Sequence, residues 1–123
     1  MADPRSFYTG WLVDPADREK LLGWFPPRYP AVVAHHVTLK FGDETAEAPG
    51  PVTAEILGEA DDGDGVQALV VAIGGSPVRP DGGTFHITWS LAPGREAKES
   101  NAVIGMHGWT SLAPTPVRLI PKR

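Results

Sequence analysis

Short apolar runs alternate with turn-forming stretches along the chain, and this pattern predicts brief strands joined by tight connections. Runs rich in β-branched and aromatic residues predict strands over residues 6–13, 32–42, 52–60, 66–73, 84–91 and 117–120. The third and fourth of these runs flank an Asp- and Gly-rich segment at residues 61–65, so they predict a hairpin.

Two other segments predict helices. Asp14 and the proline after it are typical of a helix start, and the segment that follows carries its apolar residues on one side. This helix has to end before the prolines at positions 26 and 27, because the residue before a proline disfavours helical geometry. A second helix is predicted over residues 95–104, with Gly105 as its C-terminal cap.

The predicted order is therefore strand, helix, four strands, helix, strand. Runs of strands with two helices indicate an α+β fold, in which we expect the helices to cover one side of a largely antiparallel sheet. A chain of 123 residues makes a single domain.

Composition and charge narrow the function classes. A hydrophobic content of 41% supports a buried core, whereas 14 glycines and 13 prolines disfavour a helical bundle. The absence of cysteine excludes a disulfide scaffold, a thiolate zinc site and a cysteine nucleophile. A formal net charge of −4 argues against long duplex nucleic acid as a partner.

The chain also lacks the signals that direct proteins to membranes. No run approaches the ~20 apolar residues of a membrane span, and the first residues lack the basic and apolar regions of a secretion signal. We therefore expect a cytoplasmic protein with no membrane partner, and a monomer.

An internal repeat carries the candidate chemistry. Residues 36–41 read H-V-T-L-K-F, and residues 86–91 read H-I-T-W-S-L. Because alternate side chains of a strand share a face, each strand has one polar and one apolar face. The polar faces consist of His36, Thr38 and Lys40 in one strand and of His86, Thr88 and Ser90 in the other. The pattern predicts two strands that line one polar cleft over an apolar core.

Two histidines in one cleft suit phosphodiester chemistry. Imidazole titrates closest to neutral pH, so one ring takes a proton from an attacking oxygen while the other gives a proton to the leaving oxygen. A threonine hydroxyl beside each ring donates to a phosphoryl oxygen, and Lys40 adds positive charge. None of these steps requires a metal.

The repeated H-x-T motif resembles the signature of the two-histidine (2H) phosphoesterase superfamily. That superfamily includes cyclic phosphodiesterases, RNA 2′,3′-cyclic phosphodiesterases and the phosphodiesterase part of plant and fungal tRNA ligases. The residues 7–10, the helix after them and the A-H-H-V-T-L run at 34–39 resemble its first lobe. The resemblance implies two pseudo-symmetric α+β lobes, over about residues 5–50 and 51–123, with a central cleft lined by the two H-x-T strands.

The resemblance also implies roles for individual residues. His36 and His86 become the catalytic pair, and Thr38 and Thr88 become the phosphate-binding residues, with no cofactor and no metal. The expected reaction is hydrolysis of a 2′,3′-cyclic phosphate or a related phosphodiester in a small nucleotide or at an RNA end. A phage-type phosphodiesterase that degrades cyclic oligonucleotides is an alternative. The short chain departs from the family, so the loops that shape a substrate pocket must be reduced.

Other residues are weaker candidates for substrate contacts. Besides Lys40, an aromatic ring at Tyr8 would stack on a base, and His107, in an expected loop, would reach the cleft. His35 is expected to face away from His36, on the core side or at a strand end. Adjacent rings on opposite faces disfavour zinc, although His36, His86 and His107 together would make a possible ligand set.

Two interpretations from other classes stay open. The chain would be a binding module for nucleotides or RNA ends if it kept the cleft and lost catalysis. It would be a structural domain if the H-x-T repeat were accidental.

Overall fold

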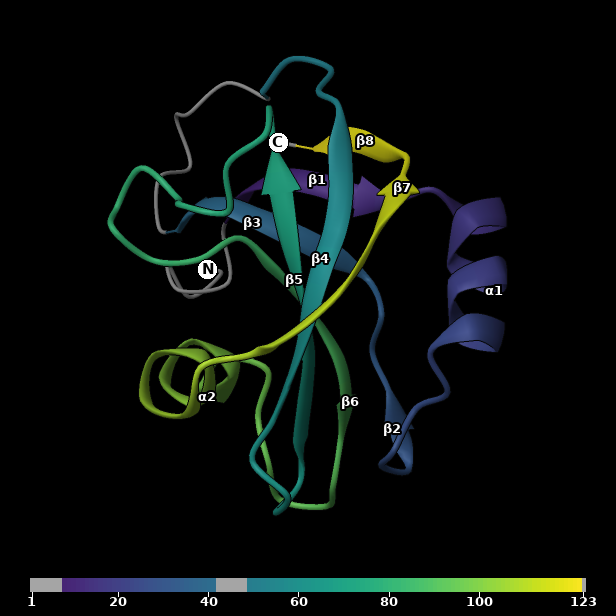
Figure 1. The fold of residues 1–123 in the computed structure, drawn as a ribbon, viewed down its shortest axis with the longest axis vertical. Helices are drawn as coiled ribbons and strands as arrows, with labels where there is room; N and C mark the ends of the chain where they lie inside the picture. The colour runs from purple at the N-terminus through teal and green to yellow at the C-terminus, as the bar shows by residue number, and fades with distance from the viewer. Residues whose placement is uncertain (1–7, 42–48, 123) are drawn as a thin grey trace, which may run out of the picture.

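The computed structural model describes residues 8–41 and 49–122, which form two helices and a curled antiparallel sheet (Figure 1). In chain order the elements are β1 (Tyr8–Val13), α1 (Pro15–Trp24), β2 (Ala31–Val32), β3 (His36–Phe41), β4 (Ala54–Asp61), β5 (Val66–Ile73), β6 (His86–Leu91), α2 (Glu99–His107), β7 (Thr110–Val117) and β8 (Leu119–Lys122). The prediction of a mixed α+β fold that consists mostly of sheet is confirmed.

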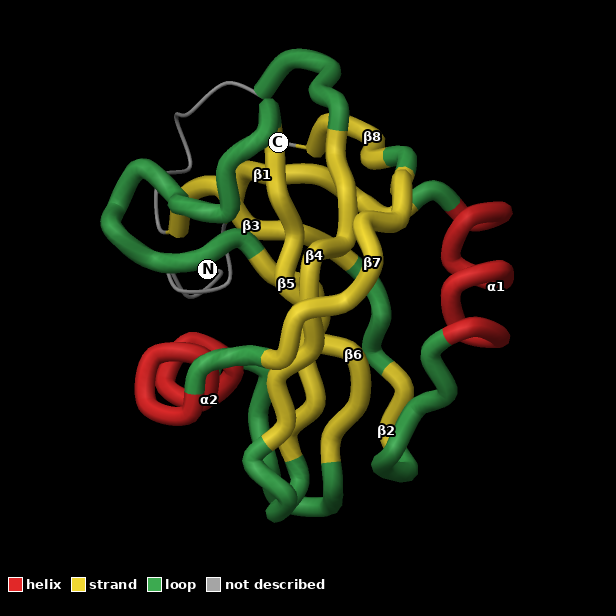
Figure 2. The backbone as a smooth tube through the Cα atoms, viewed as in Figure 1, coloured by secondary structure: helices red, strands yellow, loops and turns green. Residues whose placement is uncertain are grey.

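The strands pair in the order β7-β4-β5-β6-β3-β1-β8, and β2 pairs with β6 outside this path. The sheet curls strongly, so β1 and β3 run across the view of Figure 2 while β4 and β5 run along it. The hairpin of β4 and β5 is as predicted, with Asp61 paired to Gln67 across its turn. Strand β6 therefore lies between the hairpin and the N-terminal strands β1 and β3.

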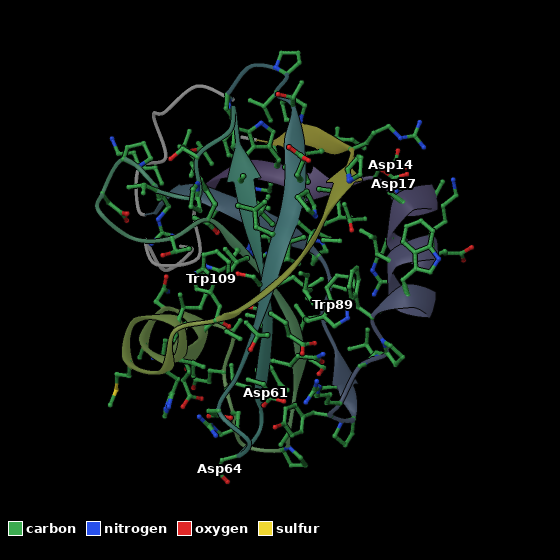
Figure 3. The ribbon with its side chains drawn as sticks, in the orientation of Figure 1. Asp14, Asp17, Asp61, Asp64, Trp89 and Trp109 are labelled. Carbon is green, nitrogen blue, oxygen red and sulfur yellow. The ribbon has the colours of Figure 1, made fainter. Side chains whose placement is uncertain are left out.

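The central strand β5 is buried on both faces and separates two apolar clusters. Its residues Leu69 and Val71 belong to the cluster that includes Leu21 of α1. Its residues Ala68 and Val70 belong to a second cluster, which includes apolar residues of α2. The helices therefore cover opposite faces of the sheet, and the expectation that both cover one side is wrong. Trp89 lies on the α1 side of the strands and Trp109 on the α2 side (Figure 3).

Helix α1 begins and ends where the sequence predicts. The Asp14 carboxylate accepts a hydrogen bond from the amide of Asp17 at 3.1 Å, and a proline occupies the first turn. Helix α2 differs from the prediction, since it begins at Glu99 and ends at His107. Gly108, with φ 70°, is the residue that caps it, because this backbone conformation favours glycine. Gly105 lies inside the helix.

The last third of the chain contains more sheet than the sequence predicts. Strand β7 pairs with β4 at one edge of the sheet although it contains Pro114 and Pro116. Proline cannot donate to a strand ladder, so an edge is where a sheet accommodates it. Strand β8 pairs with β1, and this pairing brings Lys122 beside Gly10.

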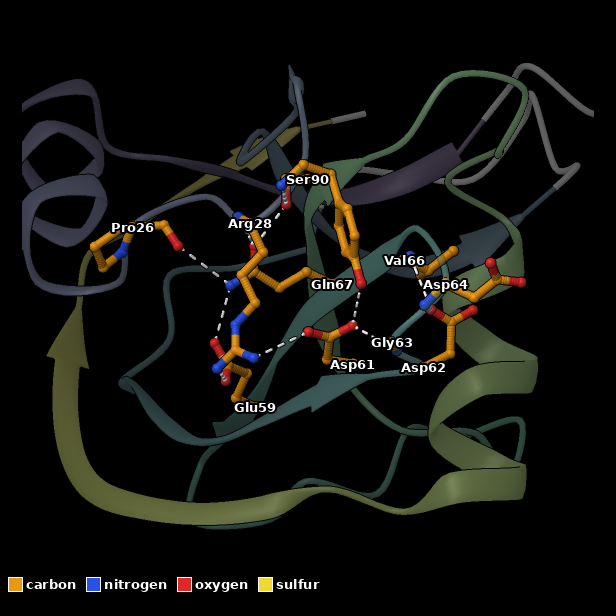
Figure 4. Close-up of polar contacts among 11 residues, drawn as sticks. Pro26, Arg28, Glu59, Asp61, Asp62, Gly63, Asp64, Val66, Gln67 and Ser90 are labelled. Carbon is orange, nitrogen blue, oxygen red and sulfur yellow. Dashed lines mark hydrogen bonds and ion pairs between the residues drawn. The ribbon is translucent and has the colours of Figure 1, made fainter.

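A buried amide holds the segment between α1 and β2 against the sheet (Figure 4). The side chain of Gln67 is fully buried, and its oxygen accepts hydrogen bonds from the amide of Arg28 at 3.0 Å and the hydroxyl of Ser90 at 2.6 Å. Its nitrogen donates to Glu59 at 2.9 Å. Arg28 in turn forms ion pairs with Glu59 and Asp61. These bonds fix residues 26–30 over the end of β6.

None of the helices in the described ranges is both long and apolar enough to cross a membrane.

Candidate functional site

The two H-x-T strands are neighbours in the sheet. Strands β3 and β6 pair in antiparallel fashion, with Val37 opposite Ile87, and both of these side chains lie in the core on the α1 side. Continued by one residue, this antiparallel register would set Thr38 across from His86, whereas the carbonyl of Thr88 accepts a hydrogen bond from the amide of Ala34 at 2.9 Å, so the pairing is irregular just before His36. Alternation directs His36, Thr38, His86 and Thr88 to the face opposite Val37 and Ile87, which α2 covers in part. The two histidines are near neighbours on that face, since the charge of His86 acts on His36.

His86 is nearly buried, at 9% exposed. Its Nδ1 lies 2.8 Å from the carbonyl oxygen of Thr84. A carbonyl only accepts, so Nδ1 carries the proton and donates it, and Nε2 is the nitrogen that takes up or releases a proton. Burial lowers the pKa of His86, the bond to Thr84 opposes this shift, and the charge of Arg79 adds to it.

His36 lies beside His35 at an irregular strand entry. Ala34, just before them, has φ 44°, which is rare for a residue with a side chain. The Nδ1 atoms of His35 and His36 are 3.0 Å apart, and the rings meet edge to face. The expectation that the two rings face away from each other is therefore wrong. Of the two positions expected for His35, the core side or a strand end, the structure shows the second, because His35 is exposed directly before β3.

The protonation of His36 is strongly disfavoured. Burial, followed by the nearby charges of His35, His86 and Lys122, lowers the pKa of His36 to about 4. His36 is therefore neutral at physiological pH. The same interactions show that His86 and Lys122 lie within electrostatic reach of His36.

The two threonines have different surroundings. Thr88 is buried beneath α2, where its hydroxyl lies 2.8 Å from the Ser100 hydroxyl and donates to the Ala97 carbonyl at 3.2 Å. Thr38 is 6% exposed. The side chain of Ser90 departs from the predicted face, because it bonds to Gln67 on the side of the 26–30 segment. A register shift between Gln67 and Ala68 accompanies this break in alternation.

A lysine that the sequence pattern does not reveal adds charge to this face. Gly10 of β1 pairs with Thr38 on one side and with Lys122 of β8 on the other. Lys122 is therefore in the same row of the sheet as Thr38, two strands away. The sequence around Lys122 does not indicate that this residue lies near Thr38. Only the pairing of β8 with β1 places it there.

The remaining sequence candidates lie elsewhere or outside the description. Lys40 is exposed, and a register shift at Thr9 and Gly10 separates it from the regular part of β3. His107 is an exposed residue in the last turn of α2, so its prediction as a loop residue is wrong. The side chain of Tyr8 lies outside the described residues.

Two hollows of different character open on the surface. One, of about 400 Å³, borders His86 and is lined by residues of the 79–86 segment and of α2. The other, of about 980 Å³, lies between α1 and the strands β4, β7 and β8, and no histidine lines it. The smaller hollow is therefore the one that adjoins the candidate chemistry.

The part of the chain that the structure describes contains no group of three or more histidine or acidic residues placed to hold a metal ion. No known protein family matches this chain, and searches of curated proteins and of solved structures give no match either.

Proposed function

We propose that this chain is a metal-independent phosphodiesterase of the two-histidine type. Its substrate would be a 2′,3′-cyclic phosphate or a related phosphodiester in a small nucleotide or at an RNA end. The observation that supports this proposal is the pairing of β3 with β6 at Val37 and Ile87, the residues that follow His36 and His86 in the two motifs. Diagonal neighbours in antiparallel strands are roughly 7–8 Å apart, a spacing that would leave room for a phosphate between two imidazoles.

The surroundings of the two rings favour one division of labour. Burial, the largest cause of its lowered pKa, keeps His36 neutral, so it suits the base. The Thr84 carbonyl stabilises a proton on His86, so His86 suits the acid. A phosphodiester bound beside His86 carries negative charge, which raises the pKa of this ring and loads it with the proton it has to give.

The reaction then follows from these assignments. His36 removes a proton from water while the water oxygen forms a bond to phosphorus. The bond from phosphorus to the leaving ribose oxygen breaks, and this oxygen takes the proton from Nε2 of His86. Thr38 donates to a non-bridging oxygen, and Lys122 compensates the charge that develops there. Thr88 is a phosphate-binding residue by the resemblance, but its hydroxyl lies against Ser100 and Ala97, so in this proposal it positions His86 through β6 in place of that role.

The proposal includes the two-lobe architecture of the resemblance. One lobe would contain β1, α1 and β3, and the other would contain β4, β5, β6, α2 and β7. The lobes would meet where β3 pairs with β6, which is where the two H-x-T motifs lie. Strand β8 crosses back to the first lobe and contributes Lys122.

The test is hydrolysis of a nucleoside 2′,3′-cyclic phosphate and of a short RNA with a cyclic phosphate end, both in EDTA. A cyclic oligonucleotide completes the panel. Wild type should open the cyclic phosphate to a 2′- or 3′-phosphomonoester, and His36→Ala and His86→Asn should each lose about 10²- to 10⁴-fold in activity. The asparagine amide replaces the Nδ1 donor to Thr84, so His86→Asn removes Nε2 while it retains the buried bond. Full activity in either variant would refute the paired-histidine mechanism.

The same panel decides between this function and its alternatives. Binding of an RNA end without cleavage would identify a binding module. The absence of both binding and cleavage would indicate that the H-x-T repeat has no function. Cleavage of the cyclic oligonucleotide alone would assign the phage-type activity.

A further inference from the structure

The hollow beside His86 is lined by a buried cation, Arg79. Residues 79–86 form its wall on one side, and Asn101 and Ile104 of α2 form the other. Its volume of about 400 Å³ falls within the ~300–1,000 Å³ range of small-molecule sites. His86 thus lies at the border between this hollow and the H-x-T face.

Arg79 is the feature that gives the hollow its chemistry. Its side chain is only 6% exposed, and Nε donates to the Asp81 carboxylate at 2.9 Å. Nη2 donates to the amide oxygen of Asn101 at 3.2 Å. Two bonds from different elements therefore hold the plane of the guanidinium in one orientation. Arginine that is fixed in this way is pre-organised for planar recognition of phosphate or carboxylate.

The two charged residues that line the hollow, Arg79 and Asp81, differ in exposure. Asp81 is the acidic residue among those that line it, and its side chain is 53% exposed, so water screens much of its charge. One oxygen of this carboxylate accepts both Arg79 Nε and the amide of Gly83. The edge of the guanidinium that faces Asp81 and Asn101 is therefore occupied, and a phosphate in the hollow would approach Arg79 beside these partners.

We infer that this hollow is a subsite for a second phosphate of the substrate, which Arg79, oriented by Asn101, recognises beside the phosphodiester at His86. This inference rests on the proposed function and names its substrate class. The substrate would be a nucleotide that carries a phosphate besides the reactive cyclic one, such as an oligonucleotide end or a 5′-phosphorylated 2′,3′-cyclic nucleotide. A mononucleoside 2′,3′-cyclic phosphate would leave the subsite empty.

The first test compares two substrates that differ only in a 5′-phosphate. Wild type should hydrolyse uridine 2′,3′-cyclic phosphate with a 5′-phosphate about 10- to 100-fold more efficiently, as kcat/KM, than the same nucleotide without it, which is the range for one charge-assisted contact. Arg79→Gln should bring this ratio close to one, and Arg79→Lys should restore part of it. Arg28→Gln is the matched control, because Arg28 pairs with Glu59 and Asp61 away from the hollow, and it should keep the wild-type ratio. Equal efficiency of wild type on both substrates would overturn the subsite.

The second test does not depend on activity or on the stability of a variant. Inorganic phosphate is titrated into wild type at constant ionic strength, while guanidinium Nε–H and imidazole signals are followed by NMR. Saturable shifts at Arg79 and His86, without shifts at Arg28, are expected. Their absence would overturn the subsite even if the chain is a phosphodiesterase. Phosphate binding without hydrolysis of any substrate would retain the subsite and refute the proposed reaction.

Discussion

The two threonines of the H-x-T motifs should respond in opposite ways to the same substitution. Thr→Val removes a hydroxyl and keeps the β-branched shape, so the response at each position reports the loss of that hydroxyl. At Thr88 the lost hydroxyl is the one that bonds to Ser100 and Ala97 beneath α2. At Thr38 it is the one that we propose donates to phosphate. The pair therefore separates structural from catalytic roles.

The expected size of each effect follows from these partners. Thr88→Val leaves the buried Ser100 hydroxyl and the Ala97 carbonyl without this partner, which costs about 1–3 kcal/mol in the free energy of unfolding. For a chain of this length, that loss corresponds to a Tm lower by roughly 4–12 °C. Thr38→Val should lower Tm by less than about 2 °C and reduce kcat/KM by about 10- to 100-fold, the loss for a hydrogen bond to a charged group.

Calorimetry gives the Tm of both variants, and the cyclic phosphate assay gives kcat/KM below the lower Tm. Thr88→Val should keep most activity once it is folded. An unchanged Tm together with as large a loss of activity as in Thr38→Val would refute the structural role, because Thr88 would then act on phosphate. Loss of stability in Thr38→Val without loss of activity would refute the role of Thr38.

Two further predictions concern pH and stability. The pH profile of kcat/KM should be bell-shaped with its maximum below 6.5, because activity is lost as pH falls through the pKa of His36, about 4, and as it rises through the lowered pKa of His86; a maximum above pH 7 would contradict the assigned roles. Gln67→Leu should lower the free energy of unfolding by about 2–4 kcal/mol, since Ser90, Glu59 and the Arg28 amide lose a buried partner. Urea denaturation measures it, and a loss below about 0.5 kcal/mol would show that the network is dispensable.

Local signals predicted much of the fold. The Asp14 cap and the prolines at 26 and 27 set the ends of α1, and the glycine-rich turn set the β4–β5 hairpin. Strand β7 escaped prediction because two prolines disqualify an interior strand, and only the pairing with β4 shows that it lies at an edge. The C-terminal limit of α2 escaped because Gly105 and Gly108 are both plausible caps until the backbone distinguishes them.

The faces that the helices cover depend on tertiary packing, although one signal was available. Residues 66–73 read V-Q-A-L-V-V-A-I, a nearly continuous apolar run. A half-exposed strand alternates, whereas a strand that is buried on both faces does not. This run therefore indicated that something covers each side of β5. Gln67, the polar exception, is the residue that anchors the 26–30 segment.

The candidate site depends on which face of each strand a side chain occupies, which alternation predicts, and on the register between strands, which alternation does not predict. Alternation alone places His36 and Thr38 on the face of β3 that points away from Val37. The burial of Val37 and Ile87 in the core agrees with this assignment. Which residues face each other across strands depends on register, and here the register changes. Ala31 pairs with Leu91 in β2, whereas Val37 pairs with Ile87 in β3, so the chain gains two residues between these pairings.

The number of these extra residues determines whether His36 lies on the same face as His86. A shift of one residue would turn the side chain of His36 into the core and that of Val37 out of it. A shift of two preserves the face, and the left-handed backbone of Ala34 accommodates the extra length. The same irregularity brings His35 against His36 and so helps to keep His36 neutral. The feature that breaks the regular strand therefore preserves the geometry and tunes the base on which the proposed reaction depends.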